Sequence, residues 1–220
     1  MNYLENLWNA LDFGSLRDTL LRVAAVLICL ILHETCHGVA AFLLGDPTAK
    51  RNHRLSLNPL RHIDWIGLAA MVLTGVGWAK PVPVDPSYFK HPKRGMAITA
   101  LAGPASNLLL ALWLLLGARL MYTNALTTGQ LNETLFYFMM NTALLSIGLG
   151  VFNLIPIPPL DGSKVLAALL PDRQYAWLMR YERFGMLIIM ALVCFGALSN
   201  VLDGAIGWVF QLFCRIVGFY

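Results

Sequence analysis

The chain has 220 residues, of which 58% are hydrophobic and only 13% carry a charged side chain. Soluble domains average about 45–50% apolar and about 25% charged residues, so this composition excludes an ordinary soluble protein and indicates an integral membrane protein. The net charge is +4, but the basic residues cluster beside apolar runs, which follows the positive-inside rule and offers no nucleic-acid-binding surface. We expect a single membrane domain over residues 1–220.

The first apolar run covers residues 20–44 and is long enough to cross a bilayer, which needs roughly 20 helical residues. Its second half carries His33, Glu34 and His37 in the pattern H-E-x-x-H. Positions i and i+4 of a helix share a face, so the two histidines can bind one metal ion with Glu34 beside them. This is the arrangement of zinc hydrolases, in which the carboxylate removes a proton from water. The glycine and proline at 45 and 47 are expected to end the helix.

A catalytic zinc site needs a third protein ligand, and two cysteines lie close to the motif in sequence. Cys29 is about 12 Å of helix rise from His37, too far for both to bind one ion. Cys36 points about 100° of helix rotation away from His37. Neither cysteine is therefore favoured. The alternative to a metal site is that the motif's polar side chains are buried and merely pair with one another, although such residues are costly in lipid.

The residues that follow form a basic, polar stretch at 48–62. Within it, residues 54–57 alternate polar and apolar, which weakly predicts a strand. Such a strand could belong to a small β-hairpin next to the active site. The alternative is a plain loop. Residues 63–78 are apolar but would reach only about 24 Å as a helix. Because both of their flanks are basic, we expect a re-entrant or interfacial element, with a short true span as the alternative.

Three further spans are predicted at 97–121, 135–157 and 184–201, while 205–219 is expected to lie at the interface or cross only partly. The predicted fold class is thus an all-α polytopic membrane protein with about five to six membrane segments. Residues 122–132 contain no Lys or Arg, which places that loop outside and the metal motif towards the cytoplasmic side.

Asp161 is the better candidate for the third ligand. It follows a run at 156–159 in which three of four residues are proline. Irregular backbone at membrane depth is tolerated only beside a cavity or within protein, which would bring Asp161 to such a place. The alternative is an ordinary Leu-Asp-Gly turn after a helix.

Several motifs, taken together, resemble the site-2 protease family of intramembrane zinc metalloproteases. They are His-Glu-x-x-His-Gly at 33–38, Gly-Asp-Pro-Thr-Ala-Lys at 45–50, Leu-Asn-Pro at 57–59, Gly-Trp-Ala-Lys-Pro-Val-Pro-Val at 77–84, Gly-Pro-x-x-Asn at 103–107 and Asn-x-x-Pro-x-x-Pro-Leu-Asp-Gly at 153–162. They cover most of the stretch from 33 to 161 in the expected order. The sequence has no inserted PDZ or CBS domain, so it resembles the compact subgroup.

The resemblance implies one zinc ion, a transmembrane protein or peptide as substrate, and the lipid bilayer as surroundings. It also implies the roles of six residues: His33, His37 and Asp161 as metal ligands, Glu34 as general base, and Asn107 and Asn153 as oxyanion or substrate-binding residues near the scissile bond. The expected activity is that of a zinc-dependent intramembrane endopeptidase, which hydrolyses peptide bonds in or near transmembrane segments.

Two other functions are compatible with a membrane protein of this composition: a catalytically silent scaffold and a metal-handling protein. A scaffold would be expected to have lost Glu34 or Asp161, and both are present. A transporter would be expected to show repeated halves with ligands spread along a path, and the sequence shows no repeat.

Overall fold

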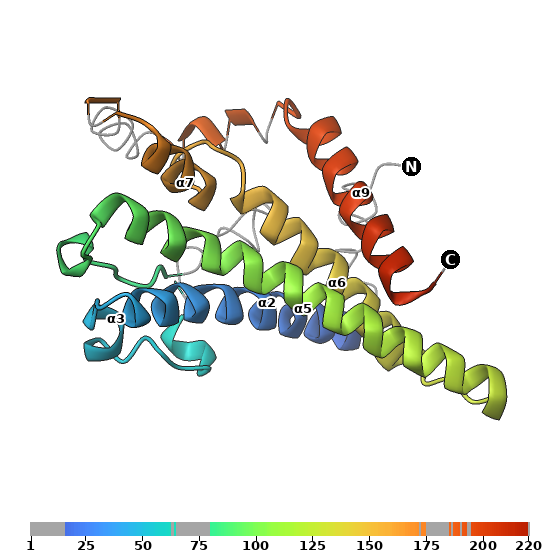
Figure 1. The fold of residues 1–220 in the computed structure, drawn as a ribbon. Coiled ribbons are helices and arrows are strands. Elements are labelled where there is room, and N and C mark those ends of the chain that lie inside the picture. The colour runs from blue at the N-terminus through green and yellow to red at the C-terminus, as the bar shows by residue number, and fades with distance from the viewer. Residues whose placement is uncertain are drawn as a thin grey trace. The chain divides into compact units, whose positions relative to one another are not determined.

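The computed structural model describes residues 16–62, 64, 80–171, 173–174, 185, 187–189, 191–192 and 195–219. The regular elements of this part of the chain are all helices, so the all-α prediction is confirmed (Figure 1). In chain order they are α2 (Leu16–Leu43), α3 (Thr48–Arg51), the 3-10 helices η1 (Pro59–Arg61) and η2 (Pro86–Tyr88), α5 (Pro92–Thr128), α6 (Glu133–Asn153), α7 (Asp161–Leu169) and α9 (Ser199–Val217).

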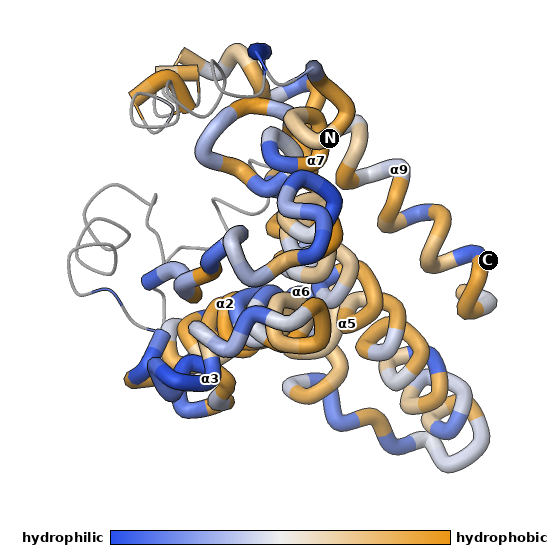
Figure 2. Tube along the Cα trace, turned by 60° about the vertical axis from the view of Figure 1, so that its left-hand side comes forward, coloured by the Kyte–Doolittle hydropathy of each residue, from blue (hydrophilic) through white to orange (hydrophobic). Residues whose placement is uncertain are grey.

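Four of the described helices, α2, α5, α6 and α9, are long and apolar enough to cross a membrane. Apolar residues dominate their length, while hydrophilic residues gather around α3 (Figure 2). Helix α5 has 37 residues and exceeds the predicted span 97–121 at both ends. It continues because residues 122–128 contain no glycine or proline, and it stops before Gly129, which has a φ of 70°. The loop expected at 122–132 is correspondingly shorter.

The remaining predicted segments are described only in part. The apolar stretch 63–78 lies outside the described residues except for Asp64, so its re-entrant character stays a prediction. The stretch 184–201 is described with gaps at 184, 186, 190 and 193–194, and its end falls in a turn at 195–198 and in α9. Helix α9 begins at Ser199 rather than at residue 205, and its 19 residues give about 28 Å, enough to approach a full crossing. The total number of membrane segments therefore stays a prediction.

The strand expected at 54–57 does not form in the structure, and the possible β-hairpin is not confirmed: these residues are irregular. A strand needs a neighbour that pairs with its backbone. Here the carbonyl oxygen of Ser56 instead lies 3.3 Å from the Thr35 hydroxyl, which donates to it, and 2.6 Å from Nε2 of His62. Side chains therefore take the place of a strand partner.

The chain packs as two compact units, to both of which α2 and α5 contribute residues. The first unit comprises Met1–Cys29, Asn107–Asn153 and Phe184–Tyr220. In it α6 packs against α9 (Figure 1). Leu115 and Ile147 are fully buried in this unit.

The second unit comprises Leu30–Ser106 and Leu154–Arg183. Helix α2 ends in it where predicted, at a turn that contains Gly45 with a φ of 107°. The next residue, Asp46, is fully buried, and its carboxylate accepts hydrogen bonds from the backbone N–H groups of Thr48 and Asp85, each at 2.8 Å. This one side chain thus joins the end of α2 to the segment that precedes η2.

A close backbone approach fixes the start of α7. A Cβ added to Gly162 would lie 2.2 Å from the carbonyl oxygen of Leu154. We expect Gly162→Ala to destabilise the protein by about 1–3 kcal/mol, the usual cost of overpacking, and to lower the Tm measured in detergent. Gly204→Ala in α9 is the matched control, because a Cβ there meets nothing within 4 Å and alanine favours the helix. An equal Tm in both variants would contradict the close approach.

Candidate metal and catalytic site

Helix α2 places His33 and His37 side by side in the second unit. The two residues are one helical turn apart, and their rings meet edge to face with centroids 4.5 Å apart. Both are buried, with 4% and 8% of their surfaces exposed. The sequence prediction that the two imidazoles share one helix face is confirmed by this geometry.

Asp161 completes the cluster from the first residue of α7. Its Oδ2 lies 3.1 Å from Nε2 of His33 and 3.1 Å from Nε2 of His37. Burial by itself would raise the pKa of the Asp161 carboxyl, but the hydrogen bonds with the two histidines hold that pKa well below its usual range. The carboxylate is therefore ionised, as a metal ligand must be.

The donor set fits a zinc ion. One ligand atom from each of His33, His37 and Asp161 lies within 4.8 Å of the others. In a tetrahedral site with bonds of about 2.0–2.2 Å, neighbouring ligand atoms are about 3.3–3.5 Å apart, close to the 3.1 Å separations seen here. Two imidazoles and one carboxylate also form the ligand type of catalytic zinc sites, which keep one position open.

A backbone carbonyl orients His37. Its Nδ1 lies 2.7 Å from the carbonyl oxygen of Thr99 in α5. Because a carbonyl oxygen only accepts, Nδ1 carries a proton, and Nε2 is the ring nitrogen that faces Asp161 and is available to a metal ion. Hydrogen bonds of this kind fix the tautomer and the ring orientation of metal-binding histidines.

Helix α5 approaches the two histidines closely at Gly103. A Cβ at this position would lie 2.4 Å from Nε2 of His37 and 2.7 Å from Cε1 of His33. Any larger residue would displace both rings from the cluster. Sequence reasoning noted Gly103 only as the first residue of the Gly-Pro-x-x-Asn motif at 103–107, although a glycine inside a long helix is a general signal of close approach.

Glu34 lies next to the cluster in sequence and is half-buried. Its Oε2 accepts a hydrogen bond of 2.9 Å from the backbone N–H of Val82. One carboxylate oxygen is thereby fixed by the main chain. Sequence reasoning missed this partner, because Val82 is far from Glu34 along the chain and carries no polar side chain.

The two cysteines near the motif are not part of the cluster that the described residues form. Cys29 is buried in the first unit, where its Sγ lies 3.8 Å from the carbonyl oxygen of Thr142. Cys36 is half-buried.

The two predicted asparagines belong to the first unit. Asn107 is fully buried in α5, and its backbone carbonyl oxygen accepts a hydrogen bond of 2.8 Å from the Ser146 hydroxyl. Asn153 is the last residue of α6, and its Nδ2 donates to the carbonyl oxygen of Leu149 at 2.9 Å. Their role near the scissile bond stays a prediction.

Comparison with known proteins agrees with this geometry. The model of peptidase family M50 matches residues 120–196. The chain is 34% identical over 175 residues to "Putative zinc metalloprotease YwhC" of Bacillus subtilis, a match that covers 77% of this chain and 78% of that protein. It is 32% identical over 198 residues to "Putative zinc metalloprotease Rip2" of Mycolicibacterium smegmatis, covering 87% of this chain and 73% of that protein.

The corresponding protein of Mycobacterium tuberculosis, "Putative zinc metalloprotease Rip2", is 30% identical over 196 residues, with 86% of this chain and 73% of that protein covered. No solved structure shows a significant match. The relatives that cover most of this chain are all named as zinc metalloproteases, and the described residues hold a buried cluster of zinc-type ligands. The chain is a metalloprotease of peptidase family M50, the site-2 protease family.

Proposed function

We propose that this protein is an intramembrane zinc endopeptidase that hydrolyses peptide bonds in or near the transmembrane segments of other membrane proteins. The observation that carries the proposal is the position of the cluster. His33 and His37 lie on a helix that is apolar and long enough to span a bilayer, and Glu34 lies between them in sequence. Ionisable side chains at such a place are expensive unless they are functional.

In this proposal His33, His37 and Asp161 bind one zinc ion. A zinc ion supplies Lewis acidity, which lets water lose a proton near neutral pH and polarises a carbonyl group. His37 is held for this role by Thr99, and Gly103 leaves room for both rings. These contacts orient the two histidine rings for metal binding.

Glu34 is the general base. Its Oε2 is fixed by the Val82 N–H, so we assign proton transfer to Oε1. Glu34 removes a proton from the attacking water, whose oxygen bonds to the scissile carbonyl carbon. When the C–N bond breaks, Glu34 returns the proton to the leaving nitrogen. We assign Asn107 and Asn153 as hydrogen-bond donors to the oxygen that becomes negative.

The proposed substrate is a transmembrane segment that reaches the site from the bilayer. Helical amides are shielded by their own i to i+4 hydrogen bonds, so such a segment must unwind locally before attack. Apolar side chains are exposed on α2 near the cluster, including Val39 and Phe42, and a lipid-facing surface of this kind would let an apolar segment approach.

We propose that the site opens towards the cytoplasm, because basic residues are concentrated on both sides of the segment at 63–78. In a cysteine-free background, His53→Cys and Lys90→Cys should react with an impermeant thiol reagent from the cytoplasmic side, and Gln130→Cys from the other side. All three positions are exposed. Labelling of His53→Cys and Lys90→Cys from opposite sides would contradict the orientation.

Removal of a ligand should remove the metal. Asp161→Ala leaves two imidazoles, and we expect its zinc content, measured on purified protein by mass spectrometry, to fall well below one ion per chain. Cys29→Ala and Cys36→Ala are the controls and should keep their zinc. Retention of zinc by Asp161→Ala together with its loss in a cysteine variant would overturn the ligand assignment.

Removal of the base should separate metal binding from turnover. Glu34→Gln keeps the shape of the side chain but cannot accept a proton, so zinc content should be unchanged while kcat falls by at least about 10²–10⁴-fold. Cleavage of a transmembrane peptide and zinc content are measured on one preparation, with a chelator-treated sample as the metal-free reference. Turnover close to that of the unaltered protein would exclude Glu34 as the base. A scaffold or a metal-handling protein would show no cleavage in any preparation.

A further inference from the structure

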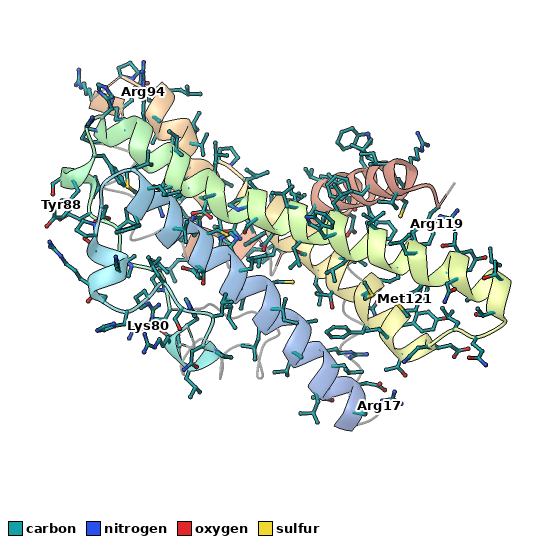
Figure 3. The ribbon with its side chains drawn as sticks, turned by 60° about the horizontal axis from the view of Figure 1, so that its bottom comes forward. Arg17, Lys80, Tyr88, Arg94, Arg119 and Met121 are labelled. Carbon is teal, nitrogen blue, oxygen red and sulfur yellow. The ribbon has the colours of Figure 1, made fainter. Side chains whose placement is uncertain are left out.

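The extended segment that starts at Lys80 and ends before η2 runs beside the C-terminal half of α2. In Figure 3, Lys80 marks the start of this stretch, and Tyr88 marks the end of η2, which follows it. At its far end the segment is held by the bond between the Asp85 N–H and the buried carboxylate of Asp46. Its near end is held by a different side chain, Arg54.

Arg54 is a buried cation in the loop after α3, with only 8% of its surface exposed. Its guanidinium binds backbone carbonyls. Nη1 donates to the carbonyl oxygen of Arg61, and Nη2 donates to the carbonyl oxygens of Lys80 and Pro81, the latter at 3.1 Å. Burial lowers the pKa of the guanidinium, while the negative charge of Glu34 acts in the opposite direction, so the charges of Arg54 and Glu34 also interact.

The bonds of Arg54 and Glu34 meet on one peptide group. The carbonyl of Pro81 and the N–H of Val82 belong to the same peptide plane, which is rigid. Arg54 binds the oxygen of this plane at 3.1 Å, and Glu34 Oε2 accepts from its N–H at 2.9 Å. Because the plane moves as one body, fixing the oxygen also fixes the direction in which the N–H points.

No other amide nearby on this segment can replace the Val82 N–H. The residues on either side, Pro81 and Pro83, have no N–H group. Val82 itself is buried, and its side chain packs close to Gly38 of α2, where an added Cβ would lie 3.2 Å from Cγ1 of Val82. A rotation of the 81–82 peptide would therefore leave Glu34 without this donor.

We propose that Arg54 is a positioning residue for the general base: it holds the Pro81–Val82 peptide group so that the Val82 N–H fixes Oε2 of Glu34. Oε1 is thereby kept in place for proton transfer. This inference rests on the proposed function, in which Glu34 is the base. Arg54 contacts neither the metal ligands nor the substrate in this role.

The alternative role of Arg54 is to join the loop at 54–61 to the segment at 80–81, with no effect on Glu34 beyond general stability. The two roles differ in one respect. A positioning residue acts through the Val82 N–H, so its effect on kcat should disappear when that N–H is absent. A residue that only stabilises the loop acts independently of the Val82 N–H, so the losses of kcat caused by changes at Arg54 and Val82 should multiply.

A double-mutant cycle on the full-length, zinc-loaded protein tests this difference. The variants are Arg54→Met, Val82→Pro and the double variant, with cleavage of one transmembrane peptide as the assay. We expect each single variant to lower kcat about 10–100-fold, the usual effect of misplacing a catalytic group by about 1 Å, with KM and zinc content unchanged. The double variant should be no slower than the slower single variant. Arg54→Lys, which keeps a donor, should recover part of the rate.

The matched controls are Arg51→Met and Val84→Pro. Arg51 is an exposed arginine in α3 that donates to the Tyr88 hydroxyl, and Val84 lies two residues further along the same segment. Both controls should retain kcat within about two-fold. Multiplicative losses in the double variant, or a loss of zinc and Tm in Arg54→Met that accounts for its lower rate, would overturn the proposal.

A second measurement does not depend on activity or on the folding of the proline variant. Val82 carries the single N–H group of residues 81–83, so its hydrogen exchange can be followed in a short peptic peptide by mass spectrometry. Arg54→Met should accelerate that exchange at least ten-fold, whereas Arg51→Met should not. Unchanged exchange in Arg54→Met would refute the positioning role even if Glu34→Gln is inactive. Fast exchange together with an active Glu34→Gln would instead refute the proposed function.

Discussion

The hydrogen bond between Nδ1 of His37 and the carbonyl oxygen of Thr99 determines how the rest of the cluster can be arranged. It places the proton on Nδ1 and turns Nε2 towards Asp161. A buried imidazole without such a partner would cost about 1–3 kcal/mol and could face either way. The same stretch of α5 contains Gly103, where the absence of a side chain gives both histidine rings their space. Two helices far apart in sequence therefore have to meet at one defined distance before a metal can be bound.

Other polar side chains of the second unit are likewise paired with backbone groups. The carboxylate of Asp46 receives two backbone N–H groups, Arg54 donates to three carbonyls, and Glu34 accepts from Val82. In an apolar environment each such group would be expensive alone. Paired in this way, the same groups tie the loops at 46–62 and 80–85 to α2. The loops around the site are held by side-chain to backbone bonds where a soluble enzyme would commonly use a sheet.

The sequence was informative where local rules decide the structure. The helix that carries His33 and His37 follows from the length of its apolar run, and its end at Gly45 follows from glycine and proline chemistry; both are seen. Asp161 could be singled out because a proline-broken run precedes it. The sequence did not predict the long-range contacts. The carbonyl of Ser56 is bonded by side chains and not by a neighbouring strand. The hydrogen bonds of Arg54 and of the Val82 N–H join residues far apart in the chain, so no local sequence pattern indicates them. Only the folded chain brings such partners together.

The proline-rich segment at 80–86 has a further consequence for the exposed part of the molecule. The Lys80 N–H is bonded to the carbonyl of His62, and those of Val82 and Asp85 are bonded to carboxylates, while positions 81, 83 and 86 are prolines. Each residue at 80–83 and 85–86 therefore either lacks an amide N–H or has that N–H in a hydrogen bond. Extended chain with free donors is a template onto which another polypeptide can add as a strand and start an aggregate. At these positions the segment has no donors to offer such a strand, so it can remain extended without inviting self-association.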